Sequence, residues 1–240
     1  MGTRHGPVAA VVLAGGSGSR FGADRNKVYL PLGGRSVLSW SVDTLAAAPE
    51  VGPVVLVIRP EDRALAERVV AQEVEHTGIE MVPGGASRQD SELAALRCLA
   101  DRIRSGRVEL VLVHDGARPL VTPKLAAEVI RTARESGGAV PGLVRDDLAE
   151  VDADGEHLAG APHRGLVAVQ TPQGFRAGPL LAAYEEAARR GFTGTDTASC
   201  LERFADLPIR WIDGDPRNLK ITYAHDLEVA EGLLARRHGA

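Results

Sequence analysis

Short apolar runs rich in β-branched residues alternate with longer segments of helical periodicity up to residue 143. The apolar runs predict strands, and the segments between them, in which apolar positions recur every 3.6 residues, predict helices. Strands joined by helices in this way form a parallel sheet that is covered on both faces. The pattern therefore predicts an α/β fold with a doubly wound, mostly parallel sheet. The expected strands cover residues 8–14, 54–58, 80–82, 110–114 and 139–143, and the expected helices, each begun by a capping Ser or an opening Pro, cover residues 36–48, 60–75, 87–103 and 123–136.

The alternation stops after residue 143. Residues 144–167 are rich in Asp, Gly and Pro, and the turn signal at 152–155 separates two short extended pieces. We expect a β-arm over about residues 144–168 that projects from the sheet. No linker is long enough to separate two domains, so the chain is expected to form one domain over residues 1–240. Beyond the arm, helices are expected over 179–190 and 196–204, strands over 209–212 and 219–222, and a closing helix from His225 or Asp226.

Composition narrows the classes of partner. The chain has 28 Lys and Arg against 32 Asp and Glu, a net charge of -4, so it lacks the global positive field of an indiscriminate nucleic-acid or lipid binder. The apolar runs are too short to span a bilayer, and residues 1–6 lack the apolar stretch of a signal peptide, so we expect a cytoplasmic protein. Cys98 and Cys200 form no CxxC motif, which argues against a zinc site or a disulfide framework and favours two buried, apolar thiols.

A glycine-rich segment follows the first expected strand. Gly15, Gly16 and Gly18 lie just past the carboxyl end of that strand, where open α/β sheets bind ligands. Glycines let backbone N–H groups approach an anion, and Arg20 and Lys27 add full positive charges. The spacing fits neither a dinucleotide fingerprint nor a Walker A loop. The segment therefore predicts a phosphate site of another kind, and the alternative is a tight turn with a solvated Arg and Lys.

Residues 13–20, with Lys27 and the Pro-Leu pair at 31–32, resemble the signature of sugar-phosphate nucleotidyltransferases. Further blocks at 84–91, 114–119, 170–175, 195–199 and 218–222 resemble the 2-C-methyl-D-erythritol 4-phosphate cytidylyltransferase family of the non-mevalonate isoprenoid pathway, over about residues 8–231. The resemblance implies a Rossmann-like fold of the nucleotidyltransferase type. It also implies transfer of a cytidylyl group from CTP to a sugar phosphate, with release of pyrophosphate.

The nucleotide half of the family pattern is intact. The resemblance implies that Arg20, Lys27 and Lys220 are catalytic cations. Asp115 ends a central strand, where a carboxylate faces the ligand crevice, so we expect it to help hold the Mg²⁺ that arrives with CTP, or a water on that ion. A helix cap is the alternative role for Ser87 and Ser91, and a structural role is the alternative for His114. Arg118 is expected either to brace its loop by a salt bridge or to lie on the ribose side. The residues implied to bind the nucleotide are Ala14, Gly15, Gly16, Gly18, Gly84, Gly85, Ala86, Ser91, Asp115 and Gly116.

The acceptor half departs from the family pattern. Asp147 stands where the family has a Thr that touches the sugar phosphate, and His163 stands where it has an Arg. A carboxylate at Asp147 would repel a phosphate, so either the loop is displaced or a neighbouring cation compensates. A third departure is Val28, where Gln is usual. The residues implied to bind the acceptor are Arg145, Asp147, His163, Arg164, Thr171 and Thr195.

Two other functions compete with this one. A ribitol-5-phosphate cytidylyltransferase would share the chemistry and differ in the alditol. A catalytically silent nucleotide-binding module would explain the altered acceptor residues. The resemblance also implies a homodimer through the β-arm, because an isolated two-stranded arm gains from a partner, and the alternative is a monomer with a mobile flap.

Overall fold

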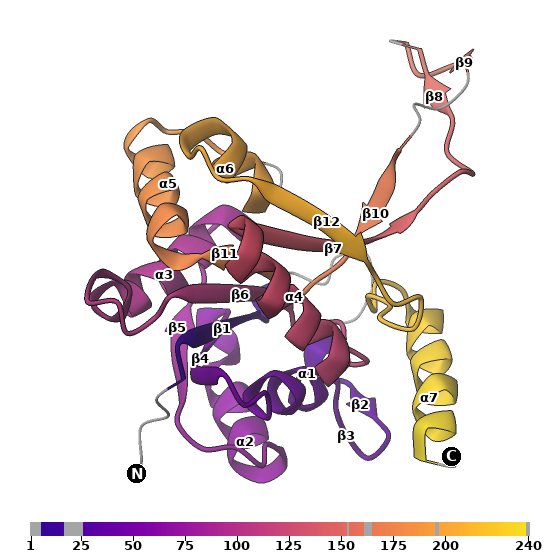
Figure 1. Ribbon diagram of the computed structural model, residues 1–240. Helices are drawn as coiled ribbons and strands as arrows, with labels where there is room; N and C mark the ends of the chain where they lie inside the picture. Colours follow the sequence, from indigo (N-terminus) through magenta and orange to yellow (C-terminus); the bar gives the residue numbers. More distant parts are fainter. Residues whose placement is uncertain (1–5, 17–25, 153, 161–164, 195–196, 239–240) are drawn as a thin grey trace.

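The computed structural model describes residues 6–16, 26–152, 154–160, 165–194 and 197–238. Eight strands form one sheet in the order β10-β7-β11-β6-β1-β4-β5, and β12 pairs with β7 (Figure 1). The pairs of β1 with β4 and β6, of β4 with β5 and of β7 with β12 are parallel, whereas β10 and β11 are antiparallel to their neighbours. The strands are β1 (Val8–Leu13), β4 (Val51–Ile58), β5 (Ile79–Pro83), β6 (Leu110–Asp115), β7 (Gly138–Val144), β10 (Val167–Val169), β11 (Gln173–Arg176) and β12 (Ile209–Asp213).

Helices cover both faces of this sheet, as the sequence predicts. Alternate residues of β1 serve the two faces: Val8, Ala10 and Val12 pack with α1, α2 and α4, while Ala9 and Val11 pack with α3, α5 and α6. The expected doubly wound, mostly parallel α/β fold is confirmed. The helices are α1 (Val37–Ala46), α2 (Arg63–Glu73), α3 (Arg88–Arg104), α4 (Pro123–Ser136), α5 (Ala177–Arg189), α6 (Thr197–Phe204) and α7 (Ala224–His238), with two 3₁₀ turns, η1 (Lys27–Tyr29) and η2 (Pro60–Asp62).

The structure corrects three expectations. Strand β11 was not expected, and it lies between β6 and β7, where it reverses the local direction of the sheet. The strand expected over 219–222 is absent from the described chain, and the backbone there makes a loop in which Ile221 N–H donates to Ala117 O at 2.9 Å. Cys200 is buried as expected, but Cys98 is exposed, because it lies on the outer face of α3.

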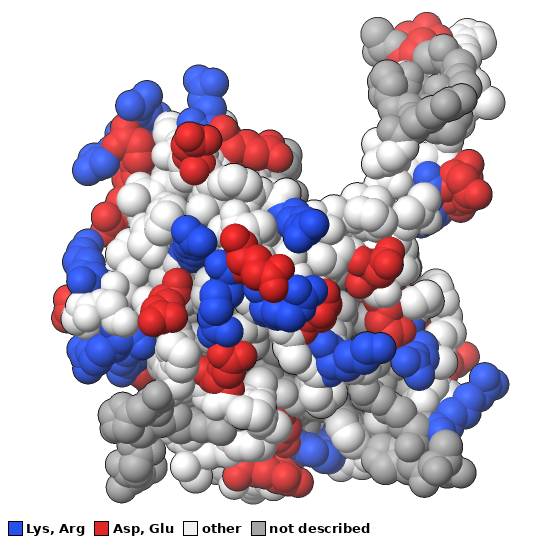
Figure 2. All heavy atoms as spheres, in the orientation of Figure 1, with Lys and Arg blue, Asp and Glu red and all other residues white. Residues whose placement is uncertain are grey.

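The expected β-arm is present. Strands β8 (Glu150–Val151) and β9 (Leu158–Gly160) form a separate antiparallel pair that projects beyond the body of the molecule (Figures 1 and 2). The turn between them is closed by Asp152, whose carboxylate accepts from the N–H groups of Glu156 and His157 at 3.3 Å. A second small sheet pairs β2 (Pro31–Leu32) with β3 (Arg35–Ser36) beside α7.

Charge is mixed on the face shown in Figure 2, where basic and acidic side chains are interspersed. This distribution matches the nearly balanced composition of the chain. Among the described residues, no helix combines the length and the apolarity needed to cross a bilayer.

Candidate active site

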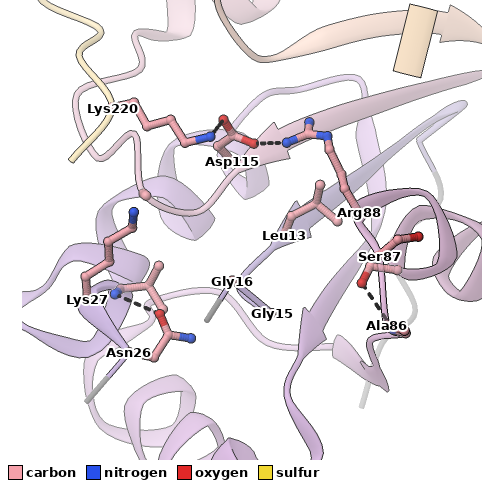
Figure 3. A pocket seen from close by; sticks show the side chains of 14 residues that line it. Leu13, Gly15, Gly16, Asn26, Lys27, Ala86, Ser87, Arg88, Asp115 and Lys220 are labelled. Atoms are coloured by element: carbon pink, nitrogen blue, oxygen red, sulfur yellow. Dashed lines mark hydrogen bonds and ion pairs between the residues drawn. The ribbon is translucent and has the colours of Figure 1, made fainter. Parts of the chain in front are cut away.

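A cavity of about 420 Å³ opens at the carboxyl ends of β1 and β6, beside the start of α3 (Figure 3). Its position is the one at which open α/β sheets bind ligands, because the loops that follow parallel strands meet at one edge. Segments far apart in the sequence contribute to it. The described residues that line it are Leu13, Gly15, Gly16, Asn26, Lys27, Val28, Gly85, Ala86, Ser87, Arg88, Ser91, Asp115, Ala117 and Lys220.

Asn26, which the sequence analysis did not single out, fixes the glycine segment to the turn that carries Lys27. Its buried side chain donates to Ala14 O at 2.7 Å and to Asp62 Oδ2 at 3.1 Å, and it caps η1. Asp62 is held in turn by two hydrogen bonds from Arg59, at 2.7 and 2.8 Å. Gly15 and Gly16 line the cavity, whereas Ala14 is buried and donates to Val57 O at 2.7 Å. Gly18 and Arg20 lie outside the described residues.

Asp115 gathers three cations at the end of β6. Its Oδ1 accepts from Arg88 Nη1 at 2.6 Å, and its Oδ2 lies 2.9 Å from Lys220 Nζ and 3.6 Å from Arg118 Nε. Figure 3 shows Arg88 and Lys220 approaching the carboxylate from opposite sides. Burial by itself raises the pKa of Asp115, but Arg88, Lys220 and Arg118 together hold it well below its usual range. Asp115 is therefore ionised and orients the cations on this side of the cavity.

These contacts fit Asp115 poorly as a magnesium ligand. Both of its oxygens already face cations, and it is the only carboxylate among the described residues that line the cavity. Mg²⁺ is normally held by one or two carboxylates together with substrate phosphates. The described residues therefore support an anchoring role for Asp115 in place of the expected metal contact.

The segment from Gly85 to Ser91 forms another wall of the cavity. Ser91 Oγ accepts from Gly85 N–H at 3.1 Å, and Gly85, Ala86 and Ser91 line the cavity. Gly84 lies behind them, where its N–H donates to Ile58 O at 2.8 Å. Ser87 caps α3 in a capping box with Asp90, which confirms the alternative role expected for Ser87.

Replacing Gly85 with alanine is expected to destabilise the protein by about 1–3 kcal/mol, the range for overpacked sites. A Cβ at this position would lie 2.2 Å from the Cβ of Asp90, so the capping box at the start of α3 would have to shift. Chemical denaturation measures the change. Gly178→Ala is the matched control, because its Cβ would meet nothing within 4 Å in the described chain, and its stability should stay within about 1 kcal/mol. A Gly85→Ala variant as stable as the control would contradict this packing argument.

Several expected site residues lie beneath the cavity and support it. Thr171 Oγ1 accepts from Asp115 N–H at 3.0 Å and lies 3.1 Å from His114 Nδ1. Burial lowers the pKa of His114 to about 4, so the imidazole is neutral near pH 7. His114 therefore has the structural role that was its expected alternative. Arg118 Nη1 donates to Asn218 O at 2.8 Å, which braces the Lys220 segment, and its salt bridge to Asp115 matches the expected bracing of its own loop. Gly116 is also outside the cavity lining, and its N–H donates to Leu13 O at 2.9 Å.

At the base of the arm, Arg145 pairs with Asp147, the carboxylate that stands where the family has a Thr. Its Nε and Nη2 donate to Asp147 Oδ1 and Oδ2 at 2.6 and 2.7 Å. These hydrogen bonds hold the pKa of Asp147 below its usual range. A neighbouring cation, one of the two accommodations considered above, is therefore present beside Asp147. The other acceptor candidates, His163, Arg164 and Thr195, lie outside the described residues.

The sheet topology and the cationic cavity at the strand ends define a nucleotide-binding α/β protein of the phosphate-transfer type. The sequence model described as IspD, 2-C-methyl-D-erythritol 4-phosphate cytidylyltransferase, matches residues 8–236. The chain belongs to this family, and the resemblance noted from its motifs is confirmed.

Individual relatives agree with this assignment. A 2-C-methyl-D-erythritol 4-phosphate cytidylyltransferase of Thermobifida fusca is 42% identical over 238 residues, which cover 96% of this chain and 94% of the relative. The crystal structure of a 4-diphosphocytidyl-2C-methyl-D-erythritol synthase from Anaerococcus prevotii is similar with a TM-score of 0.81 and 28% identity, covering 96% of this chain and 97% of that one. The corresponding cytidylyltransferase of Thermus thermophilus gives a TM-score of 0.71 and 31% identity, covering 94% and 98%.

Proposed function

We propose that this protein transfers the cytidylyl group of CTP to 2-C-methyl-D-erythritol 4-phosphate and releases pyrophosphate. Membership of the family supports the reaction, and one structural observation carries it. Lys27, Arg88 and Lys220 come from three distant segments and line one cavity beside Gly15 and Gly16. Among the described residues that line the cavity, these three cations share one carboxylate, Asp115, so the lining carries a net positive charge that suits a polyanionic ligand.

The reaction asks mainly for positioning and charge neutralisation. An oxygen of the acceptor phosphate attacks the α-phosphorus of CTP, a new P–O bond forms, and the bond to the bridging oxygen of the β-phosphate breaks. Pyrophosphate leaves with that electron pair. We assign Lys27 to the triphosphate and Lys220, held by Asp115 at 2.9 Å, to the α-phosphate, where negative charge develops in the transition state.

The backbone of Gly85 and Ala86, with Ser91, is proposed to read the cytosine edge. These residues line the cavity, Figure 3 shows Ala86 across from Lys27, and Ser91 fixes the peptide of Gly85 through its hydroxyl. We propose that Mg²⁺ enters the site with the triphosphate as its main ligand, since Asp115 is already paired with Arg88 and Lys220. Such an ion would supply further neutralisation of phosphate charge.

We also propose that the chain acts as a homodimer in which each arm reaches its partner's cavity. The arm exposes apolar side chains, with Val144, Val151 and Leu158 between 56% and 75% exposed, and a two-stranded arm is marginal in water by itself. The mass in solution from light scattering should be twice that of the chain. A mass of 25.3 kDa would contradict the dimer.

The test of the reaction is to offer CTP with each sugar phosphate to the purified protein and to follow pyrophosphate release. We expect turnover with 2-C-methyl-D-erythritol 4-phosphate. Turnover of ribitol 5-phosphate alone would replace the proposed acceptor. Thermal protection by CTP without pyrophosphate from any acceptor would identify a silent nucleotide-binding module.

We place the reaction in the cytoplasm, which the two free cysteines support.

A further inference from the structure

A buried carboxylate behind the cavity has no part in the reaction described above. Glu92 lies on α3, and its side chain is 2% exposed. Its Oε1 accepts from Arg88 Nε at 2.8 Å and from Thr197 Oγ1 at 2.9 Å, while its Oε2 accepts from the hydroxyl of Tyr184. Tyr184 belongs to α5 and Thr197 begins α6, and both are almost completely buried. Three helices therefore meet at one carboxylate.

Packing does not require a charge at this position. The neighbouring cluster is apolar, with Leu93, Leu96, Leu180 and Leu201 in the same core, and an apolar residue would fill the space without losing hydration. A buried ion pair is often no more stabilising than well-packed apolar side chains of the same volume. The presence of Glu92 therefore indicates that it orients a side chain with which it pairs.

That partner is Arg88, whose guanidinium spans two carboxylates. Nε donates to Glu92 one helical turn away, and Nη1 donates to Asp115 at 2.6 Å. A planar guanidinium that is bound through two of its nitrogens has a fixed plane and direction, which a single ion pair would not impose. Arg88 in turn occupies Oδ1 of Asp115 and leaves Oδ2 for Lys220. The orientation of Lys220 thus depends on Glu92 through two intermediate side chains.

The same carboxylate connects a second segment to the cavity. Thr197, which donates to Glu92, lies two residues after Thr195, the position that the family resemblance implies for acceptor binding. Glu92 holds the start of α6 and Arg88 through the same oxygen, Oε1. One buried oxygen therefore joins Arg88 at the cavity to the first residue of α6.

We propose that Glu92 is a positioning residue for cytidylyl transfer, which holds Arg88, and through it Asp115 and Lys220, in register with the first turn of α6. This inference rests on the proposed function. Glu92 touches no reacting atom, so its effect is transmitted through Arg88. Tyr184 and Thr197 act as the donors that keep the Glu92 carboxylate in place.

The main test is Glu92→Gln, which keeps the shape and removes the charge. We expect kcat to fall roughly tenfold or more, as for a lost charged hydrogen bond, while the KM for CTP changes much less. Asp101→Asn is the matched control, because it makes the same charge change at an exposed position of the same helix and should leave kcat unchanged. A folded Glu92→Gln variant with the kcat of the control would overturn the proposal.

A double-mutant cycle tests whether Glu92 acts through Arg88. If it does, Glu92→Gln combined with Arg88→Met should lose no more kcat than Arg88→Met alone. Additive losses would indicate a general structural role and contradict the proposal. Should Glu92→Gln fail to fold, Tyr184→Phe and Thr197→Val each remove one donor, and each should lower kcat in a folded protein. Unchanged kcat in both variants would also contradict it.

The pH profile gives a readout that a purely structural role would not move. Burial raises the pKa of Glu92, and the ionisable groups around it are Arg88 on its own helix, Tyr184 on α5 and Asp115 on β6. The wild type should lose kcat as the pH falls and Glu92 is protonated, whereas Glu92→Gln should lack this limb. An identical acid limb in both would contradict the inference. A wild type that releases no pyrophosphate at any pH would contradict the proposed function itself.

Discussion

Alanine in place of Lys27 should leave a folded protein whose kcat is about 10²- to 10³-fold lower, the typical cost of losing one preorganised group that stabilises transition-state charge. Lys27 lines the cavity from η1, and Figure 3 shows its side chain extending toward the side of the cavity that holds Asp115 and Lys220. The turn itself is held by Asn26, so removal of the ammonium group should not disturb the backbone. Pyrophosphate release at saturating substrates measures the effect.

Lys124→Ala is the control for this experiment. Lys124 is exposed on the first turn of α4, outside the cavity lining, so the same substitution there should leave kcat unchanged. The two melting temperatures should agree. If Lys27→Ala kept more than roughly a tenth of the wild-type kcat, Lys27 would not be the electrostatic group that the mechanism requires.

The second large effect is expected for Asp115→Asn. The amide keeps the shape but leaves Arg88, Lys220 and Arg118 without their common counter-charge in a buried site. Removing one partner of a buried ion pair typically costs about 3–5 kcal/mol, and we expect a loss of unfolding free energy in this range. Activity should fall as well, because Lys220 loses its anchor. Chemical denaturation and turnover measure the two losses.

The difference in unfolding free energy between wild type and Asp115→Asn should depend on pH in a definite direction. Because the folded-state pKa of Asp115 is depressed, its stabilising contribution is fully present above the unfolded-state pKa of about 3.9. It is lost as the pH falls toward the folded-state pKa. The stability gap between wild type and Asp115→Asn should therefore be constant near neutral pH and narrow below about pH 4.

Glu128→Gln provides the comparison. Glu128 pairs with Arg131 on the exposed surface of α4, and pairs that are screened by solvent in this way contribute little to stability. A stability loss for Asp115→Asn no larger than for Glu128→Gln would show that the cation cluster does not depend on Asp115.

Local sequence signals were sufficient for most of the sheet and its helices. Strands β1, β4 and β6 are continuous apolar runs buried on both faces, and α3 begins at the Ser87 cap that the sequence indicates. Strand β11 has only four residues and no alternating pattern, so its place between β6 and β7 is set by tertiary pairing. The loop around Ile221 shows the opposite case. Residues 219–222 alternate apolar and polar side chains as a strand would, but the N–H of Ile221 donates to Ala117 O and the segment stays a loop.

The sequence predicted only part of the candidate site, because tertiary contacts form the rest of it. The resemblance pointed to Lys27, Lys220 and Asp115, and the structure brings all three to one cavity. The resemblance did not predict where the side chain of Arg88 points, although Arg88 lies within the block at residues 84–91. Contacts such as Arg88 to Asp115, or Asn26 to Asp62, join segments that are far apart along the chain, so no local pattern encodes them.

A crystal structure with CTP tests the central claim most directly. The account predicts the glycine segment and Lys27 at the triphosphate, Lys220 Nζ within hydrogen-bonding distance of an α-phosphate oxygen, and the cytosine against Gly85 and Ser91. A nucleotide bound elsewhere, with Lys27 and Lys220 directed into solvent, would contradict it.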